Sequence, residues 1–179
     1  LSLSLSLSLS SLSLSLSLTY TKQAFSTTEA IESQWILAGH NMTVLSEQQI
    51  VDCDQGRGDE GCNGGDTVTA YQYVMAAGGL ETEAAYPYLG VDSTCRFNKQ
   101  SVSATIKNWG YVTQNKNETQ MQITLVAKGP LSICVDAETW QFYEGGVITD
   151  FCGNSLDHCV MVILSLSLSL SLSLSLFSL

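Results

Sequence analysis

The chain has 179 residues, but two stretches of it are not ordinary protein sequence. Residues 1–18 and 164–179 are almost entirely Leu-Ser alternation, so the informative segment is residues 19–163, which is long enough to bury a core. All Lys, Arg, Asp and Glu residues lie in this segment and give a net charge of −10, which argues against a nucleic-acid partner.

The first tract, residues 1–18, carries no charge and is half Ser, unlike a signal peptide, and we expect no membrane span in the chain. As polypeptide, such alternation predicts strands with one Leu face and one Ser face. A run of CT dinucleotides reads as Leu-Ser in any frame. We therefore hypothesise that both tracts are translated microsatellite DNA and not native coding sequence.

The first predicted helix begins at about residue 24. Its apolar positions Ala24, Ile31, Trp35 and Ala38 fall on one helical face, which predicts that this face is buried. Gly39 is well suited to end the helix, because glycine readily adopts the left-handed conformation found there.

Two further helices follow before residue 100. Ser46 and Gln49 have the spacing of a capping box at the start of a short helix. Asp66 can cap a third helix, which we expect to end at Gly78. The segment from about residue 24 to residue 100 is therefore predicted to be a helical half.

The segment from about residue 101 to residue 163 is predicted to be rich in strands. We expect strands at Val102–Thr113, Leu131–Val135 and Cys159–Ile163, with one helix at about Glu118–Lys128. Gly129 and Pro130 would stop that helix. The sequence thus predicts an α+β fold whose helical and β-rich halves meet at a cleft.

Acidic residues cluster between the second and third predicted helices, at Asp52, Asp54, Asp59, Glu60 and Asp66. Their spacing lacks the glycine and the terminal glutamate of an EF-hand, so a solvated acidic loop is the better interpretation. The cysteines include no Cys-x-x-Cys pair, which argues against structural zinc. We expect no metal and no cofactor.

The chain has two histidines. His40 follows a helix end and is expected on the surface. His158 opens an apolar strand, and taken alone it is better interpreted as a structural residue than as a catalytic one.

Asn41 and Asn117 each begin an N-x-Thr sequon, which is glycosylated only in a secretory lumen. With six cysteines in the chain, these sequons favour an oxidising environment. We expect a lysosomal or secreted protein.

Five strings, taken in order, change the interpretation of His158. They are Ala24-Phe25-Ser26-Thr27-Thr28-Glu29-Ala30-Ile31-Glu32, Leu45-Ser46-Glu47-Gln48-Gln49-Ile50-Val51-Asp52-Cys53-Asp54, Gly61-Cys62-Asn63-Gly64-Gly65, Glu83-Ala84-Ala85-Tyr86-Pro87-Tyr88 and Leu156-Asp157-His158. In composition, order and spacing they resemble the papain-like cysteine peptidases of the cathepsin group. The resemblance runs over residues 24–163, and the chain resembles a partial catalytic domain that lacks both ends.

The resemblance implies a helical left domain, a β-barrel-like right domain and peptide or protein substrates in the cleft between them. His158 matches the family's catalytic histidine, which protonates the leaving amine and later activates water. The family's nucleophilic cysteine lies at the N-terminus of the central helix, where the helix dipole and an imidazolium stabilise its thiolate.

This chain departs from the family at that position, because Lys22 replaces the nucleophile and Gln23 replaces a tryptophan. The oxyanion-hole glutamine would fall at Leu16. The asparagine that orients the histidine would fall in the second tract. We expect the chain as written to be inactive, because a Lys22 ammonium cannot act as the nucleophile. The alternative function is a non-catalytic, peptide-binding pseudoenzyme.

The resemblance also implies a set of substrate-facing residues. Gly64 and Gly65 match the backbone ladder that pairs with an extended peptide. The right-domain side of the cleft is matched by Cys134, Leu156, Asp157 and Cys159. Cys134, Leu156 and Cys159 match the walls of the pocket for the second residue before the scissile bond, which suggests an apolar preference; alternatively, they are ordinary small core residues.

Cysteine pairing is implied in the same way. Cys53 and Cys95 match a disulfide that closes a loop of the left domain. Cys62 would pair with a cysteine at the position of Thr19, and Cys152 with one beyond the retained segment. We expect a monomer that folds poorly as written, because unpaired cysteines invite mispairing.

The microsatellite hypothesis makes a prediction about the transcript. If an intron has been read as exon, the spliced message encodes Cys-Trp immediately before Ala24 and an asparagine-containing motif after Ile163. Sequencing the mature transcript tests this. A message that still encodes Lys22 and Gln23 there would favour the pseudoenzyme.

Overall fold

The computed structural model describes residues 21–56, 58–143, 145, 148, 152–165 and 173–176. The helices are α1 (Lys22–Leu37), α2 (Glu47–Cys53), α3 (Thr67–Ala77) and α4 (Glu118–Lys128). The strands are β1 (Leu80–Glu81), β2 (Val102–Ala104), β3 (Leu131–Val135), β4 (His158–Ser165) and β5 (Ser173–Leu176). Short 3-10 helices lie at Gly61–Asn63, Lys99–Ser101 and Glu138–Phe142. The α+β fold expected from the sequence is confirmed.

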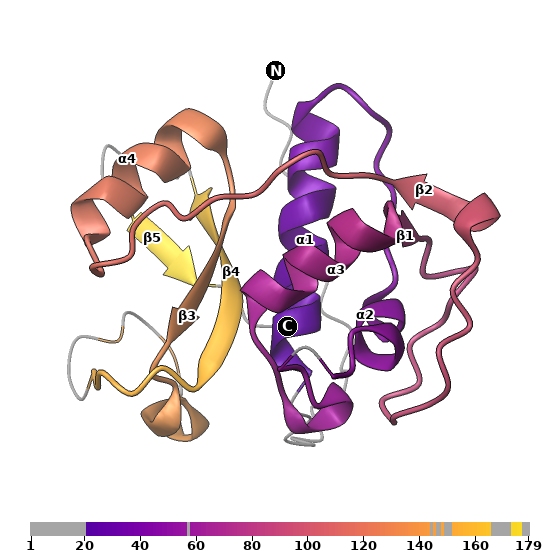
Figure 1. Ribbon diagram of the computed structural model, residues 1–179. Coiled ribbons are helices and arrows are strands. Elements are labelled where there is room, and N and C mark those ends of the chain that lie inside the picture. Colours follow the sequence, from indigo (N-terminus) through magenta and orange to yellow (C-terminus); the bar gives the residue numbers. More distant parts are fainter. Residues whose placement is uncertain are drawn as a thin grey trace.

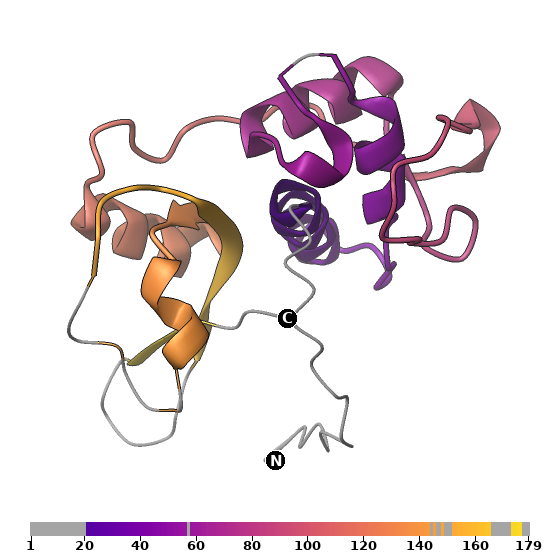
Figure 2. The same cartoon turned by 90° about the horizontal axis from the view of Figure 1, so that it is seen from below.

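The described elements form two halves on either side of α1 (Figure 1). One half contains α2, α3 and the small antiparallel sheet β1-β2, and the other contains α4 and the antiparallel sheet β3-β4-β5. The view from below shows α1 end-on between the two halves (Figure 2).

Helix α1 is bonded to the sheet through a buried hydroxyl. Ser26 Oγ lies 2.6 Å from Ser132 Oγ of β3 and donates a hydrogen bond of 2.9 Å to the carbonyl of Val160 in β4. Tyr71 of α3 also bonds Ser132, so three elements meet at that hydroxyl. Burial raises the pKa of Tyr71 to about 12, against the effect of the Ser132 bond.

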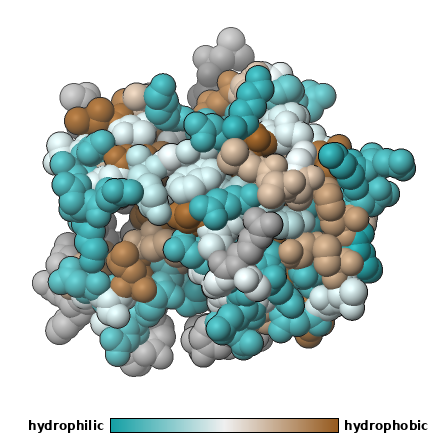
Figure 3. All heavy atoms as spheres, in the orientation of Figure 1, coloured by the Kyte–Doolittle hydropathy of each residue, from teal (hydrophilic) through white to brown (hydrophobic). Residues whose placement is uncertain are grey.

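The core of the helical half consists of buried residues from α1, α2, α3, β1 and β2, together with Leu45, which lies just before α2. They are Ala24, Ile31, Leu45, Ile50, Val51, Ala70, Tyr73, Val74, Leu80 and Ala104. The face of the molecule in Figure 3 is a mixture of hydrophilic and hydrophobic residues, as is normal for a folded domain.

The helix ends follow the capping residues found in the sequence. Ser46 Oγ accepts a bond from the backbone N–H of Gln49 at the start of α2, and Asp66 accepts from that of Val68 at the start of α3. Gly78 ends α3 in the left-handed conformation. The prediction for α4 is confirmed at both ends.

Two local predictions were wrong. Ala38, expected on the buried face of the first helix, is exposed, because the last turn of α1 extends beyond the core. The strand expected over Val102–Thr113 ends at Ala104, and it pairs with β1 in the helical half. β1 has only two residues, so it offers no partner for a longer strand.

The acidic loop is solvated only in part: Glu60 and Asp66 are exposed as expected, whereas Asp52, Asp54 and Asp59 are buried. Asp52 accepts hydrogen bonds from Ser93, Tyr86 and Gln48. Burial alone would raise the pKa of Asp52, but these bonds outweigh it and hold the pKa below its usual value. These carboxylates organise the surrounding loops.

Glu47 makes the stability of the fold depend on pH. It is buried beside Thr28, and burial together with the charges of Glu83 and Glu32 raises its pKa to about 7, despite hydrogen bonds from its own backbone and Thr28. Glu47 therefore prefers to be protonated in the folded state. A raised folded-state pKa gives stability that is present in acid and lost as the pH rises through about 7.

In the wild-type chain, we expect Glu47 to lower the free energy of unfolding by about 3 kcal/mol between about pH 5 and pH 8. We predict that Glu47→Gln removes most of this pH-dependent decrease. Urea unfolding at both pH values measures it, and Glu118→Gln, on the exposed first turn of α4, serves as the control. An equal pH dependence in wild type and Glu47→Gln would contradict the assignment.

Candidate active site

One cleft lies between the helical half and the sheet, and it encloses about 360 Å³. Its lining includes all eight residues that the sequence analysis assigned to the site, which come from distant parts of the chain. These are Lys22, Gly64, Gly65, Cys134, Leu156, Asp157, His158 and Cys159. Their individual roles stay predictions.

Lys22 and His158 lie at the ends of two elements that converge on the cleft. Lys22 is the first residue of α1, and His158 is the first residue of β4. Burial lowers the pKa of His158, and the positive charge of Lys22 lowers it further, while Asp157 opposes both effects. His158 is therefore biased toward the neutral imidazole.

Two polar atoms of the cleft residues are buried without a hydrogen-bond partner among the described residues. They are Nδ1 of His158 and Oε1 of Gln23. The ring of Trp140 packs edge-on against His158, with 5.8 Å between the centroids. This edge-on contact restricts the position of the imidazole, while Nδ1 makes no hydrogen bond among the described residues.

Gly64 and Gly65 differ in what their backbones can offer to a ligand. Gly64 donates to the carbonyl of Gly61 and accepts from the N–H of Glu60 within its own loop. Within the described residues, neither backbone group of Gly65 has a partner. Gly65 is thus the residue of the pair that can bond an extended peptide.

Asp157 and Leu156 lie next to the histidine in sequence but have different surroundings. Asp157 Oδ1 accepts a 2.8 Å hydrogen bond from the N–H of Ala137, and the Asp157 N–H donates to the carbonyl of Val135. These bonds fix the turn that leads into β4. The side chain of Leu156 is 52% exposed and adds an apolar surface to the cleft.

Cys134 and Cys159 form a disulfide, which the sequence analysis did not anticipate when it treated them as separate pocket walls or core residues. They are direct partners across β3 and β4, with 4.0 Å between their Cα atoms. The pair therefore contributes one covalent unit to the wall of the cleft.

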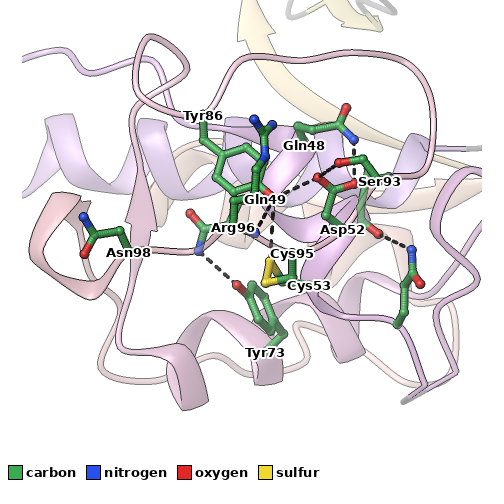
Figure 4. Close-up of a disulfide and its surroundings, with 12 residues drawn as sticks. Gln48, Gln49, Asp52, Cys53, Tyr73, Tyr86, Ser93, Cys95, Arg96 and Asn98 are labelled. Carbon is green, nitrogen blue, oxygen red and sulfur yellow. Dashed lines mark hydrogen bonds between the residues drawn. A yellow bond between two sulfur atoms is a disulfide. The ribbon is translucent and has the colours of Figure 1, made fainter.

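The expected disulfide between Cys53 and Cys95 is present. Figure 4 shows it beside Tyr86 and Asp52, with the Gln49 side chain bonded to Tyr73. Cys62 carries a thiol, whose pKa is raised by burial and by Asp92. Thr19 and Leu16, which the sequence analysis matched to family positions, lie outside the described residues.

Asn41 and Asn117 are both exposed, and glycosylation at each stays a prediction. Asn117 caps α4 by accepting from the N–H of Gln120, which leaves its amide nitrogen available. The described residues contain no group of three or more side chains suited to hold a metal ion. None of the described helices combines the length and apolar character needed to cross a bilayer.

Three further residues line the cleft that the sequence analysis did not assign to substrate: Gln23, Asn63 and Asp66. Each adjoins a residue that was assigned, Gln23 to Lys22, Asn63 to Gly64 and Asp66 to Gly65. Their position next to assigned residues could have indicated them in the sequence, but adjacency alone does not show which neighbours face the cleft.

A helix N-terminus and a strand-borne histidine that line the same cleft are the arrangement of hydrolases that use a cysteine–histidine pair. The profile described as papain family cysteine protease matches residues 22–164. The chain belongs to this family.

The relatives support the same assignment. Cysteine proteinase 1 of Dictyostelium discoideum is 42% identical over 150 residues, covering 78% of this chain and 43% of that protein. Cathepsin L1 of Drosophila melanogaster is 40% identical over 144 residues, covering 78% of this chain and 38% of that protein. The chain thus spans about two fifths of the length of these curated relatives.

A solved structure agrees in fold. The digestive procathepsin L2 proteinase from Tenebrio molitor larval midgut superposes with a TM-score of 0.73 at 34% sequence identity, covering 80% of this chain and 46% of that one. The papain-like fold expected from the sequence is confirmed.

The coupling between Lys22 and His158 predicts the outcome of a substitution. In Lys22→Met the pKa of His158 should rise, because the nearby positive charge is removed while the burial remains. NMR titration of the imidazole measures this. Lys107→Met is the matched control, because Lys107 is exposed and does not line the cleft. A His158 pKa that is equal in all three proteins would show that Lys22 does not act on it.

Proposed function

We propose that the protein is a cysteine-type peptidase of the papain family that binds peptides in the cleft, and that the chain carrying Lys22 does not hydrolyse them. The observation that carries the proposal is the position of Lys22 and His158 on the same cleft. In the family, a thiolate at the helix N-terminus attacks the peptide carbonyl, and the histidine then protonates the leaving amine.

Lys22 cannot take the part of that thiolate. Its ammonium has no lone pair to attack a carbonyl while it is protonated. A thiolate in its place would stabilise the imidazolium and raise the pKa of His158, whereas Lys22 lowers it. The electrostatics of the cleft are thus the reverse of those that a cysteine–histidine pair requires.

The substrate that fits the cleft is an extended peptide with an apolar side chain near the scissile bond. The unpaired backbone of Gly65 supports antiparallel pairing with such a peptide. Leu156 and the Cys134–Cys159 disulfide supply the apolar wall. We propose a lysosomal or secreted location, supported by the two disulfides and by the exposed sequons.

The alternative is a pseudoenzyme that holds peptides without cleaving them. It is favoured by the same Lys22, if the position is occupied by lysine in the mature protein. Both proposals require peptide binding. Only the first requires that a cysteine introduced at position 22 should act as a reactive nucleophile.

We predict that Lys22→Cys gains labelling at position 22 by a peptide-like, thiol-directed inhibitor, whereas the wild-type chain is not labelled there and hydrolyses no peptide. At about pH 6, the added His158→Ala change should reduce this labelling by at least about tenfold, because the thiolate loses its imidazolium partner. Peptide mapping by mass spectrometry locates the label and separates it from labelling of other thiols.

Calorimetric titration with a non-cleavable peptide provides the second measurement. A variant that binds the peptide but is not labelled at position 22 would favour the pseudoenzyme over the peptidase. If the wild-type chain hydrolyses peptides and loses this activity when a remaining cysteine is replaced, both proposals are contradicted, because both treat the chain with Lys22 as inactive.

A further inference from the structure

The disulfide between Cys134 and Cys159 is placed where a ligand in the cleft can reach it. Both cysteines line the cleft, and both are partly exposed. Lys22 and His158 line the same cleft, and Cys159 directly follows His158 in β4. The mechanism proposed above uses the pair only as an apolar wall and makes no use of its bond.

The strand pairing keeps the two sulfurs together whether or not they are bonded. The register of β3 and β4 runs from Leu131 opposite Val162 to Val135 opposite His158, and the cysteines are one of its direct pairs. Ser26 also ties both strands to α1. Opening the disulfide would therefore leave two thiols facing each other, ready to pair again.

The other disulfide is in a different situation. Cys53 and Cys95 close a separation of 42 residues, and Cys95 is exposed in a segment without strand pairing. Tyr86 and Asp52 bond the chain around Cys53 and Cys95, including the N–H of Arg96 (Figure 4). The Cys53–Cys95 bond is thus part of the loop framework of the helical half, away from the cleft lining.

Lys22 is the group on the cleft that favours thiol chemistry at Cys134 and Cys159. An attacking thiolate and a departing thiolate are both anions, and the ammonium of Lys22 lies on the same cleft at the N-terminus of a 16-residue helix. The carboxylates of Asp66 and Asp157 also line the cleft and oppose this effect. In each of them one oxygen accepts a backbone hydrogen bond, from the N–H of Val68 and from that of Ala137 respectively.

We propose that Cys134–Cys159 is a thiol-exchange site, at which a low-molecular-weight thiol forms a mixed disulfide inside the cleft. The thiolate attacks one sulfur, the protein S–S bond breaks, and the second sulfur leaves as a thiolate that takes a proton from water. A second thiol can then attack the mixed disulfide, giving the oxidised thiol dimer and a protein with two thiols. Two electrons pass from the two thiols to the protein disulfide.

The mixed disulfide has a consequence for binding, which rests on the proposed peptide-binding function. It holds the thiol's substituent against the wall formed by Leu156 and the strand ends of the sheet. A peptide side chain would need the same space. A protein that carries the mixed disulfide should therefore not bind the peptide, and a protein with bound peptide should not form the mixed disulfide.

Reduced glutathione, applied to the folded full chain without peptide, tests the exchange itself. Thiols present at the start are first alkylated, and new thiols and adducts are then located by peptide mass spectrometry. We expect a glutathione adduct at position 134 or 159. Exchange at Cys53–Cys95, where Cys95 is exposed, serves as the internal reference. Lys22→Met should slow exchange at Cys134–Cys159 but not at Cys53–Cys95.

Two results would overturn the exchange site: no glutathione adduct at position 134 or 159, or an equal effect of Lys22→Met on the two disulfides. Calorimetric titration with a non-cleavable peptide then tests the link to binding. Glutathione adduct formation should abolish peptide binding in the wild-type chain. In Cys134→Ser/Cys159→Ser, whose own peptide affinity is measured first, the affinity with glutathione should equal the affinity without it. Equal binding with and without the adduct would refute competition. Rapid exchange in a chain that binds no peptide in either state would refute the proposed function and leave the exchange site supported.

Discussion

The hydrogen bond from Ser26 to the carbonyl of Val160 sets the geometry on which the cleft depends. Ser26 lies one helical turn after Lys22, so the two side chains share a face of α1. Val160 lies two residues after His158, on the same side of β4. One bond therefore fixes the rotation of α1 and the register of β4 relative to each other, and with them the positions of Lys22 and His158.

The same contact explains why α1 buries hydroxyl groups in place of a purely apolar face. Ser26, Thr27 and Thr28 are all buried. Ser26 and Thr28 bond to groups outside their own helix turn, whereas the Thr27 hydroxyl has no partner among the described residues. A hydroxyl that is buried without a partner costs stability, whereas a bonded one specifies its partner. The helical half and the sheet are thus held in one arrangement by polar contacts that an apolar interface would not provide.

The helices and their ends were predicted best from the sequence, because capping residues and apolar periodicity are local properties. The ends of α3 and α4 follow from Asp66, Gly78 and Gly129, whose effects need no knowledge of the rest of the chain. The end of β2 at Ala104 could not be predicted in this way, because it is decided by the length of its partner β1. The burial of Asp52 was missed for a similar reason, since two of its three donor residues, Tyr86 and Ser93, lie 34 and 41 residues away.

The residues of the candidate site were found by resemblance, and their arrangement came only from the structure. No local pattern indicates that Cys134 and Cys159 are bonded, since they are 25 residues apart in sequence. The pairing would follow from the strand register, but register is decided by which faces of β3 and β4 are buried and by their bonds to α1. The chemistry of the cleft wall therefore depends on packing that lies behind it.

Gly64 and Gly65 are required by the structure of their own loop, apart from any role in binding a peptide. A Cβ atom at Gly65 would collide with the carboxylate of Asp59, which accepts the N–H of Asp66 and so helps to start α3. Gly64 has a φ of 119°, which side chains rarely adopt. Both glycines are therefore needed by the loop itself, and their identity alone says nothing about a peptide. The support for peptide pairing comes instead from the backbone of Gly65, which the loop leaves unbonded while it uses that of Gly64.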